Sequence, residues 1–179
     1  MRVLDLGANV EVSAEQLYQF AVMGSVLTSS VTQKGRPKVG LLNVGEEEIK
    51  GNELVKKTAE LLIERNAVNY CGYVEGDAIY KGNVDVVVCD GFVGNIMLKN
   101  AEGLAKYIKT IFRREFKKNW FTSFLSILAY PVLKQIMNIL STKKRNGATF
   151  LGLNGIVMKS HGSADRVAFY YAIQEAVRA

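Results

Sequence analysis

Three segments of this sequence each combine glycine with a small polar residue and a nearby lysine, at residues 43–52, 90–99 and 159–165. Glycine lets a ligand approach the backbone closely, and a small polar residue is suited to begin a helix. The first turn of a helix has unpaired N–H groups and a partial positive charge, which suit phosphate. The three segments therefore predict anion binding, although none matches a P-loop or a dinucleotide-binding fingerprint.

The segment at 159–165 is the richest in hydrogen-bond donors. Its hydroxyl, imidazole and backbone donors belong to Ser160, His161, Gly162 and Ser163, which follow Lys159. A single histidine is often a structural residue with a satisfied ring, but His161 stands between a serine and a glycine at an expected helix start. That setting favours a role in a binding site.

The other two segments offer fewer donors. Asn95 is placed to cap a helix, and Lys99 lies one turn further on. Lys50 and Gly51 follow Glu46, Glu47 and Glu48, acids that are favourable before a helix in any case. Because a glycine cluster after a strand is also typical of a tight turn, the coincidence of three such loops is what favours a ligand site.

The elements that must position these loops are five β-branched runs, at residues 3–6, 38–42, 67–73, 85–89 and 155–158. Helical patterns follow them, the first with Ser13 as its N-cap and Gln16 three residues on. This alternation predicts an α/β fold with a parallel sheet. In such sheets ligands bind outside the carboxyl ends of the strands, where the three loops are expected.

The composition describes an ordinary globular protein of 179 residues with 49% apolar residues, for which we expect one domain. Two cysteines and no recognisable secretory leader favour a reducing, intracellular setting and exclude a disulfide scaffold. Cys89 is expected to pack in the core, because no adjacent cation activates it. Two cysteines and one histidine also cannot form a usual structural zinc site, so no metal is predicted.

The positive charge is concentrated in one segment. Ten of the 23 Lys and Arg residues but only one of the 17 acids, Glu115, lie between residues 106 and 145. A basic block on a mildly acidic body predicts a surface that meets an anionic partner, such as lipid head groups, an acidic protein or nucleic acid.

An uncharged stretch at residues 120–133 lies inside this basic segment and is too short to span a bilayer as a helix. Its apolar side chains fall on one helical face: Trp120, Phe121, Phe124, Leu125, Ile127 and Leu128. The pattern resumes after Pro131, which predicts two short amphipathic helices. Basic residues flank them: Arg113, Arg114, Lys117 and Lys118 on one side, and Lys143, Lys144 and Arg145 on the other.

Such a helix pair suits the interface of an anionic membrane, but the apolar face is equally suited to packing against the core or a second subunit. Both interpretations hold together if dimerisation builds a projecting hairpin. Nucleic acid is the weaker candidate, because the aromatic residues do not alternate with the basic ones.

Several motifs, in this order, closely resemble the PlsX family of bacterial phosphate acyltransferases. They are Leu-Asp-Leu-Gly-Ala-Asn-Val at 4–10, Gln-Phe-Ala-Val-Met-Gly at 19–24, Val-Gly-Leu-Leu-Asn-Val-Gly-Glu-Glu at 39–47, Lys-Gly-Asn at 50–52, Val-Cys-Asp-Gly-Phe-Val-Gly-Asn at 88–95 and Lys-Ser-His-Gly-Ser at 159–163. The resemblance covers essentially the whole chain.

This resemblance implies a three-layer α/β/α sandwich with a mostly parallel sheet, like those of isocitrate dehydrogenase and phosphate acetyltransferases, plus a projecting amphipathic helical hairpin. It implies a single α/β domain over residues 1–179, with the helical insertion at about 106–145. Family members are longer at the N-terminus, so part of the active cleft is expected from residues that precede those of this sequence.

The activity implied by the resemblance is transfer of a fatty acyl group from acyl-acyl carrier protein to inorganic phosphate, without a cofactor. The acyl phosphate would feed a glycerol-3-phosphate acyltransferase in phosphatidic acid synthesis. The resemblance also implies a cytoplasmic homodimer bound peripherally to the inner face of the cytoplasmic membrane, and no nucleic-acid partner.

The site residues that the resemblance implies fall into three groups. Lys159, Ser160 and His161 are expected to be catalytic, with Gly162 and Ser163 as further phosphate or oxyanion contacts. The acyl-phosphate or pantetheine end is assigned Asp90, Gly91, Asn95 and Lys99, and the remaining loop supplies Asn43, Glu46, Lys50 and Asn52. The membrane or carrier surface is assigned Arg113, Arg114, Lys117, Lys118, Trp120, Phe124 and Leu128.

Two other functions remain open at this point. A short-chain phosphate acyltransferase acting on coenzyme A thioesters needs the same anion-binding loops but no amphipathic hairpin. A dimerising membrane-surface module without catalysis needs only the amphipathic segment.

Overall fold

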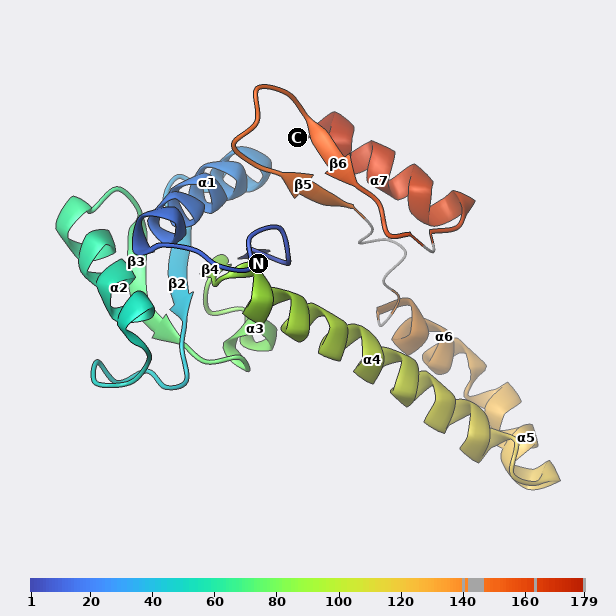
Figure 1. Ribbon diagram of the computed structural model, residues 1–179. Coiled ribbons are helices and arrows are strands. Elements are labelled where there is room, and N and C mark those ends of the chain that lie inside the picture. The colour runs from blue at the N-terminus through green and yellow to red at the C-terminus, as the bar shows by residue number, and fades with distance from the viewer. Residues whose placement is uncertain (140, 142–146, 163, 179) are drawn as a thin grey trace. The chain divides into compact units, whose positions relative to one another are not determined.

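The computed structural model describes residues 1–139, 141, 147–162 and 164–178 (Figure 1). Its internal contacts divide the chain into two compact units, Met1–Leu98 and Lys99–Ala179. Ser163 and the three basic residues Lys143, Lys144 and Arg145 lie outside the described residues. The single domain over residues 1–179 stays a prediction.

The amino-terminal unit is built on a four-stranded parallel sheet in the order β1-β4-β2-β3 (Figure 1). The strands are β1 (Arg2–Leu4), β2 (Lys38–Leu42), β3 (Asn69–Val74) and β4 (Val86–Val88). Leu4 pairs with Val88, and Leu41 pairs with the same valine from the other side. Because every pair is parallel, all four carboxyl ends reach the same edge of the sheet.

Helices cover both faces of this sheet. α1 (Ala14–Thr32) and α2 (Glu53–Arg65) pack on the face that Val86 and Val88 present, while α3 (Ala78–Lys81) packs on the opposite face with Val87. Consecutive side chains of a strand point to opposite faces, so an uninterrupted valine run is what a sheet covered on both sides requires. The α/β fold with three layers, as predicted, is confirmed.

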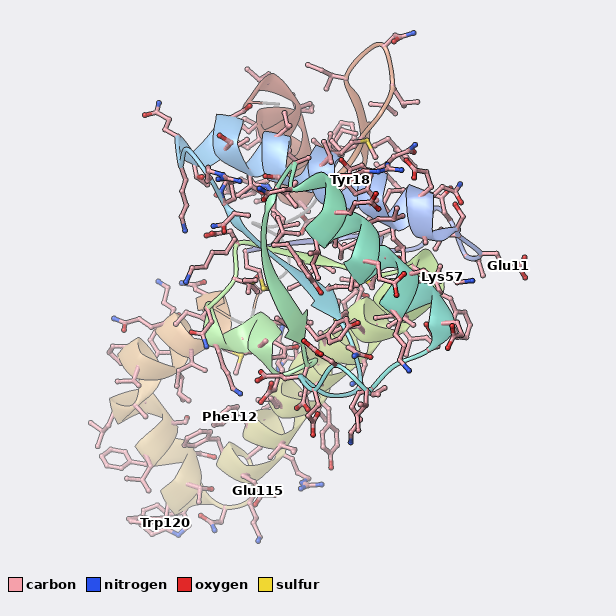
Figure 2. The ribbon with its side chains drawn as sticks, turned by 90° about the vertical axis from the view of Figure 1, so that its left-hand side faces the viewer. Glu11, Tyr18, Lys57, Phe112, Glu115 and Trp120 are labelled. Carbon is pink, nitrogen blue, oxygen red and sulfur yellow. The ribbon has the colours of Figure 1, made fainter. Side chains whose placement is uncertain are left out.

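Local sequence fixes the starts of α1 and α2. Ser13 and Gln16 form a reciprocal capping box, as predicted. Asn52 caps α2 by accepting a hydrogen bond from the backbone N–H of Val55 at 2.9 Å. Between the two helices, the guanidinium of Arg65 lies 4.6 Å from the ring centroid of Tyr18, a residue labelled in Figure 2.

α4 (Gly91–Phe116) begins in the amino-terminal unit and continues into the second. The remaining elements belong to the carboxy-terminal unit: α5 (Trp120–Leu128), α6 (Tyr130–Ile139), β5 (Ala148–Phe150), β6 (Val157–Lys159) and α7 (Arg166–Arg178). The two short amphipathic helices are confirmed; Pro131 lies in the first turn of α6, where its missing N–H costs no intrahelical hydrogen bond.

The final strand corrects one sequence-based expectation. Residues 155–158 were expected to continue the parallel pattern, but β6 pairs antiparallel with β5, with Ala148 opposite Lys159. The pattern missed β5 because its Ala-Thr-Phe sequence is not an uninterrupted β-branched run like the three valines of β4. α7 packs on this hairpin through the buried residues Ala168 and Ala172.

Candidate active site

Asp5 organises the loop that leaves β1. Asp5 is only 7% exposed, and its carboxylate accepts hydrogen bonds from the backbone N–H groups of Gly7, Ala8 and Asn9 at 2.9, 3.0 and 2.6 Å. The side-chain amide of Asn9 donates a further bond at 3.0 Å. Burial by itself would raise the pKa of Asp5, but these hydrogen bonds outweigh it and hold the pKa below its usual value.

This loop is pressed against the start of α4. The N–H of Gly91 donates to the carbonyl of Asn9 at 2.8 Å, and Gly94 lies directly against the carbonyl of Asp5. Neither glycine has room for a Cβ atom. Glycine is therefore required at both positions for close packing of helix and loop, and not to form a turn.

The N-cap of α4 is Asp90 and not Asn95, which corrects the sequence-based expectation. The helix starts at Gly91, and the Asp90 carboxylate accepts from the N–H of Val93 at 2.8 Å. Asn95, which was expected to cap, lies in the second turn beside Gly7. Asp90 caps because it stands immediately before the first residue that can turn helical, whereas Asn95 stands too far along. The N–H groups of Gly91 and Val93, in the first turn of the helix, thus have acceptors within the chain.

The loop after β2 is held together by amides. Asn43 is buried, and its side chain donates to the carbonyl of Lys50 at 3.2 Å. Gly51, at φ +92°, lies against the Asn43 amide, a backbone conformation that L side chains rarely adopt. Asn43 and Asn52 thus have structural partners, while the side chains of Glu46 and Lys50 are exposed.

In the carboxy-terminal unit, His161 and Lys99 are brought together by a residue that the sequence analysis missed. The Glu102 carboxylate lies 3.0 Å from the Lys99 ammonium and 3.9 Å from the Nε2 atom of His161. The only signal in the sequence is the i, i+3 spacing of Lys99 and Glu102 on a helix, which does not reveal the histidine.

The loop from Lys159 to Gly162 precedes its helix by several residues. The N–H of Ala164 donates to the His161 carbonyl at 2.9 Å, which closes a turn. α7 then begins at Arg166, capped by the Asp165 side chain, which accepts from Ala168 N–H at 2.9 Å. His161 therefore lies in a loop and not at the expected helix start, because Asp165 supplies the cap. Lys159 is exposed and Ser160 is half-buried.

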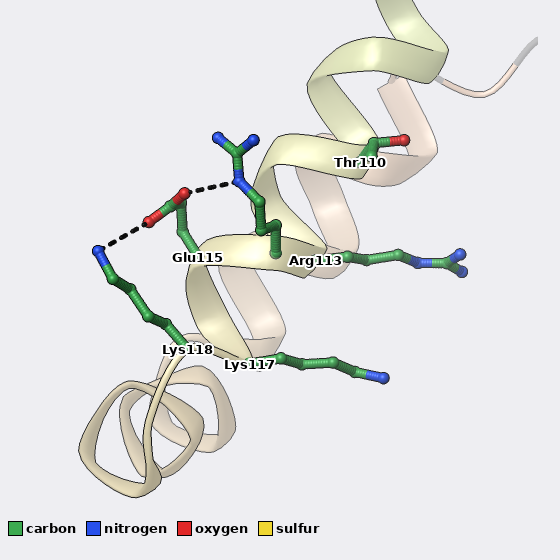
Figure 3. A pocket seen from close by; sticks show the side chains of 6 residues that line it. Thr110, Arg113, Glu115, Lys117 and Lys118 are labelled. Carbon is green, nitrogen blue, oxygen red and sulfur yellow. Dashed lines mark hydrogen bonds and ion pairs between the residues drawn. The ribbon is translucent and has the colours of Figure 1, made fainter.

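A basic surface covers the end of α4. Thr110, Arg113, Arg114, Glu115, Lys117 and Lys118 line an open depression there (Figure 3). Glu115 pairs with Arg114 at 2.9 Å and with Lys118 at 3.9 Å. Figure 3 shows Arg113 and Lys117 pointing away from Glu115. The acid therefore neutralises one side of this surface and leaves the other strongly positive.

The amphipathic pair α5 and α6 exposes its apolar face. Trp120, labelled at the start of α5 in Figure 2, is 82% exposed, and Phe124 and Leu128 are also exposed. The polar face points to the end of α4, because the hydroxyls of Thr122 and Ser123 donate to the carbonyl of Phe116 at 3.4 and 3.0 Å. Among the described helices, none is both long and apolar enough to cross a membrane.

Cys89 is buried, and burial raises the pKa of its thiol to about 12, so it is not a thiolate nucleophile. Within the described parts of the chain, no three His, Cys, Asp or Glu side chains gather in a way that could hold a metal ion.

This chain matches a protein family over its whole length and several known proteins at 56% identity. A family model described as "Fatty acid synthesis protein" matches residues 1–179. The phosphate acyltransferase of Legionella pneumophila (strain Corby) is 56% identical over 176 residues, which are 98% of this chain and 52% of that protein. The phosphate acyltransferase of Coxiella burnetii (strain Dugway 5J108-111) is also 56% identical, over 99% of this chain and 52% of its own length. The Bordetella parapertussis phosphate acyltransferase is 56% identical over 97% of this chain and 49% of its own length.

The chain thus spans about half the length of the curated relatives that it matches. The family model covers all of its residues, and the motifs that resemble PlsX lie at the strand ends and the loops that follow them, apart from the motif at 19–24, which lies in α1. The chain belongs to the fatty acid synthesis protein family, that is, the PlsX family of phosphate acyltransferases.

Proposed function

We propose that this chain carries part of an enzyme that transfers a fatty acyl group from acyl-acyl carrier protein to inorganic phosphate, for phosphatidic acid synthesis. The observation that carries the proposal is 56% identity to phosphate acyltransferases over 98% of the chain. The site supports it, because Lys99 and His161 share one carboxylate and Lys159 stands two residues before His161.

The proposed reaction begins when a phosphate oxygen attacks the carbonyl carbon of the thioester. A tetrahedral oxyanion forms, which preorganised donors must stabilise. The C–S bond then breaks, leaving acyl phosphate and the thiolate of the carrier's pantetheine arm, which takes up a proton from solvent. Because a thiol has a pKa of about 8.5, this leaving group needs little general-acid help.

The work of the enzyme is therefore to hold a phosphate beside the thioester. We assign the phosphate and oxyanion contacts to Lys159, Ser160 and His161, with Gly162 and Ser163 beside them. Asp90, Gly91, Asn95 and Lys99 are assigned to the acyl-phosphate or pantetheine end. Asn43, Glu46, Lys50 and Asn52 line the remaining loop, of which Lys50 has the exposed ammonium.

The surfaces of the carboxy-terminal unit fit two partners of this reaction. The basic surface on α4 suits the acidic carrier protein, and the exposed apolar face of α5 suits the inner surface of the cytoplasmic membrane. We further propose a homodimer that passes acyl phosphate to a glycerol-3-phosphate acyltransferase.

The experiment is release of carrier thiol from a long-chain acyl-acyl carrier protein, with and without inorganic phosphate, with acyl phosphate trapped by hydroxylamine. Because the chain spans half of its relatives, it is assayed alone and mixed with the remaining portion of the Legionella pneumophila relative. Phosphate-dependent release in either sample supports the proposal.

Faster phosphate-dependent release from acetyl-coenzyme A than from the long-chain carrier would replace the proposal with the short-chain activity. No release from either donor in either sample, with vesicle binding retained, would replace it with a membrane-surface module.

A further inference from the structure

Glu102 joins two side chains that reach it from separate segments. One carboxylate oxygen, Oε2, faces the ammonium of Lys99 on the same helix, and the other, Oε1, faces Nε2 of His161 in the loop after β6. The Glu102 side chain is only 15% exposed, whereas those of Lys99 and His161 are 55% and 45% exposed. A largely buried acid thus underlies two accessible groups of the proposed phosphate site.

We propose that Glu102 is a positioning residue, which holds Lys99 and His161 as one preorganised pair. The inference rests on the proposed function and adds to it a residue that acts through its neighbours. Lysine has many rotamers, and fixing its side chain when phosphate arrives costs conformational entropy. An existing ion pair meets part of that cost before the substrate binds, which is how positioning groups raise a rate.

The Glu102 carboxylate also orients the imidazole ring of His161. A functional histidine commonly has a carboxylate at one ring nitrogen, which fixes the plane of the ring and the position of its proton. The 3.9 Å separation is longer than a hydrogen bond, and such contacts often tighten only when substrate is bound.

Positioning and plain electrostatics predict opposite results. An acid that merely stands near an anion site repels phosphate, so its neutralisation would strengthen phosphate binding. If Glu102 positions Lys99 and His161, its neutralisation instead lowers turnover. The conservative change Glu102→Gln keeps the shape of the side chain and its helix propensity and removes only the charge.

The first test reads the imidazole directly. His161 is the single histidine in the sequence, so the whole chain gives one set of imidazole signals in a long-range ¹H–¹⁵N spectrum. We expect these signals to shift in Glu102→Gln and in Glu102→Asp, whose carboxylate is one methylene shorter. The matched control is Glu64→Gln, which neutralises an exposed acid on α2. Signals that stay in place in both Glu102 variants overturn the proposal.

The second test is a double-mutant cycle on turnover, with the complementing portion of the relative present. Glu102→Gln is expected to lower kcat by about 10- to 100-fold, by analogy with the loss seen when the carboxylate partner of a metal-bound histidine is removed. In a His161→Ala background, Glu102→Gln should lower kcat much less, because the histidine through which Glu102 acts is already absent. An equal loss in both backgrounds, or a higher kcat/KM for phosphate, contradicts the positioning role.

The two tests separate the two proposals. If the unaltered protein shows no phosphate-dependent release, the proposed function fails, and the imidazole spectrum still decides whether Glu102 positions His161. If release is normal and the imidazole signals are unaffected, only the role of Glu102 is rejected.

Discussion

Asp5 and Asn9 are joined by two hydrogen bonds, because the Asp5 carboxylate accepts from both the backbone N–H and the side-chain amide of Asn9. The carbonyl of the same asparagine accepts from Gly91 at the start of α4. A short loop thereby links the end of β1 to the helix that follows β4. The link holds the loop after β1 against the first turn of α4.

The first prediction is that Asp5→Asn destabilises the protein by about 1–3 kcal/mol at neutral pH, because an amide cannot accept all the bonds that the carboxylate accepts. The pKa of Asp5 is lower in the folded protein than its ordinary value of about 4, so its contribution is fully present above that value. That contribution is lost as the pH falls toward the lower, folded-state pKa.

Urea unfolding of the unaltered protein and of Asp5→Asn, at a series of pH values, measures this contribution. The difference in unfolding free energy should be constant above about pH 5 and should shrink below about pH 4. A difference that does not change with pH would mean that the charge of Asp5 does not matter.

Two glycines of α4 provide a second prediction. A Cβ at Gly94 would collide with the carbonyl of Asp5, whereas a Cβ at Gly103 would meet open space. Gly94→Ala should therefore destabilise by about 1–3 kcal/mol, as overpacking does. Gly103→Ala on the same helix should stabilise by about 0.5–1 kcal/mol. Thermal unfolding of the two variants checks both signs, and similar shifts in Tm would rule out the tight packing of α4 on the loop.

The extent to which sequence predicts this molecule depends on how local each signal is. The capping pair Ser13 and Gln16 and the valine run of β4 depend on neighbours within a few residues, so pattern alone was enough. The start of α4 depends instead on Asp5 and Asn9, which are distant in sequence. Gly91 and Gly94 were therefore expected in the loop before a helix capped by Asn95, although they are helical.

The same reason explains the omissions in the site. His161 and Lys99 were found because their types suggest chemistry, but nothing local to either one indicates that Glu102 links them. The sequence assigned no separate role to Asp5, which stood only within a motif, because its four hydrogen bonds form only in the folded loop. The residue types of the site could thus be predicted from the sequence, whereas their hydrogen-bond and ion-pair partners could not.

The third prediction concerns carrier binding. Arg114 and Lys118 are paired with Glu115, whereas Arg113 and Lys117 point away from it (Figure 3). Replacing Arg113 and Lys117 together by alanine should therefore raise the Kd for acyl carrier protein more than replacing Arg114 and Lys118 together, because the second pair is already partly neutralised. Titration calorimetry at about 0.05 M and 0.3 M salt measures this, and binding of the unaltered protein should weaken at the higher salt. Equal effects of the two double variants, or binding that does not depend on salt, would exclude this surface as the carrier site.

The last prediction concerns the apolar face of α5. Phe124 and Leu128 are exposed on that face, while Ser126 lies on the other face of the helix, where its hydroxyl donates to the Ser123 carbonyl. Transfer of a large apolar side chain out of water contributes about 1.5–3 kcal/mol, so Phe124→Glu or Leu128→Glu should weaken membrane binding by roughly 10-fold or more. Ser126→Glu adds the same charge to the same helix and should change binding little. Co-sedimentation with phosphatidylglycerol vesicles checks this, and sedimentation velocity of the same variants measures their self-association. If the Phe124 and Leu128 variants bind vesicles normally but lose self-association, the apolar face is covered by a second subunit and not by lipid.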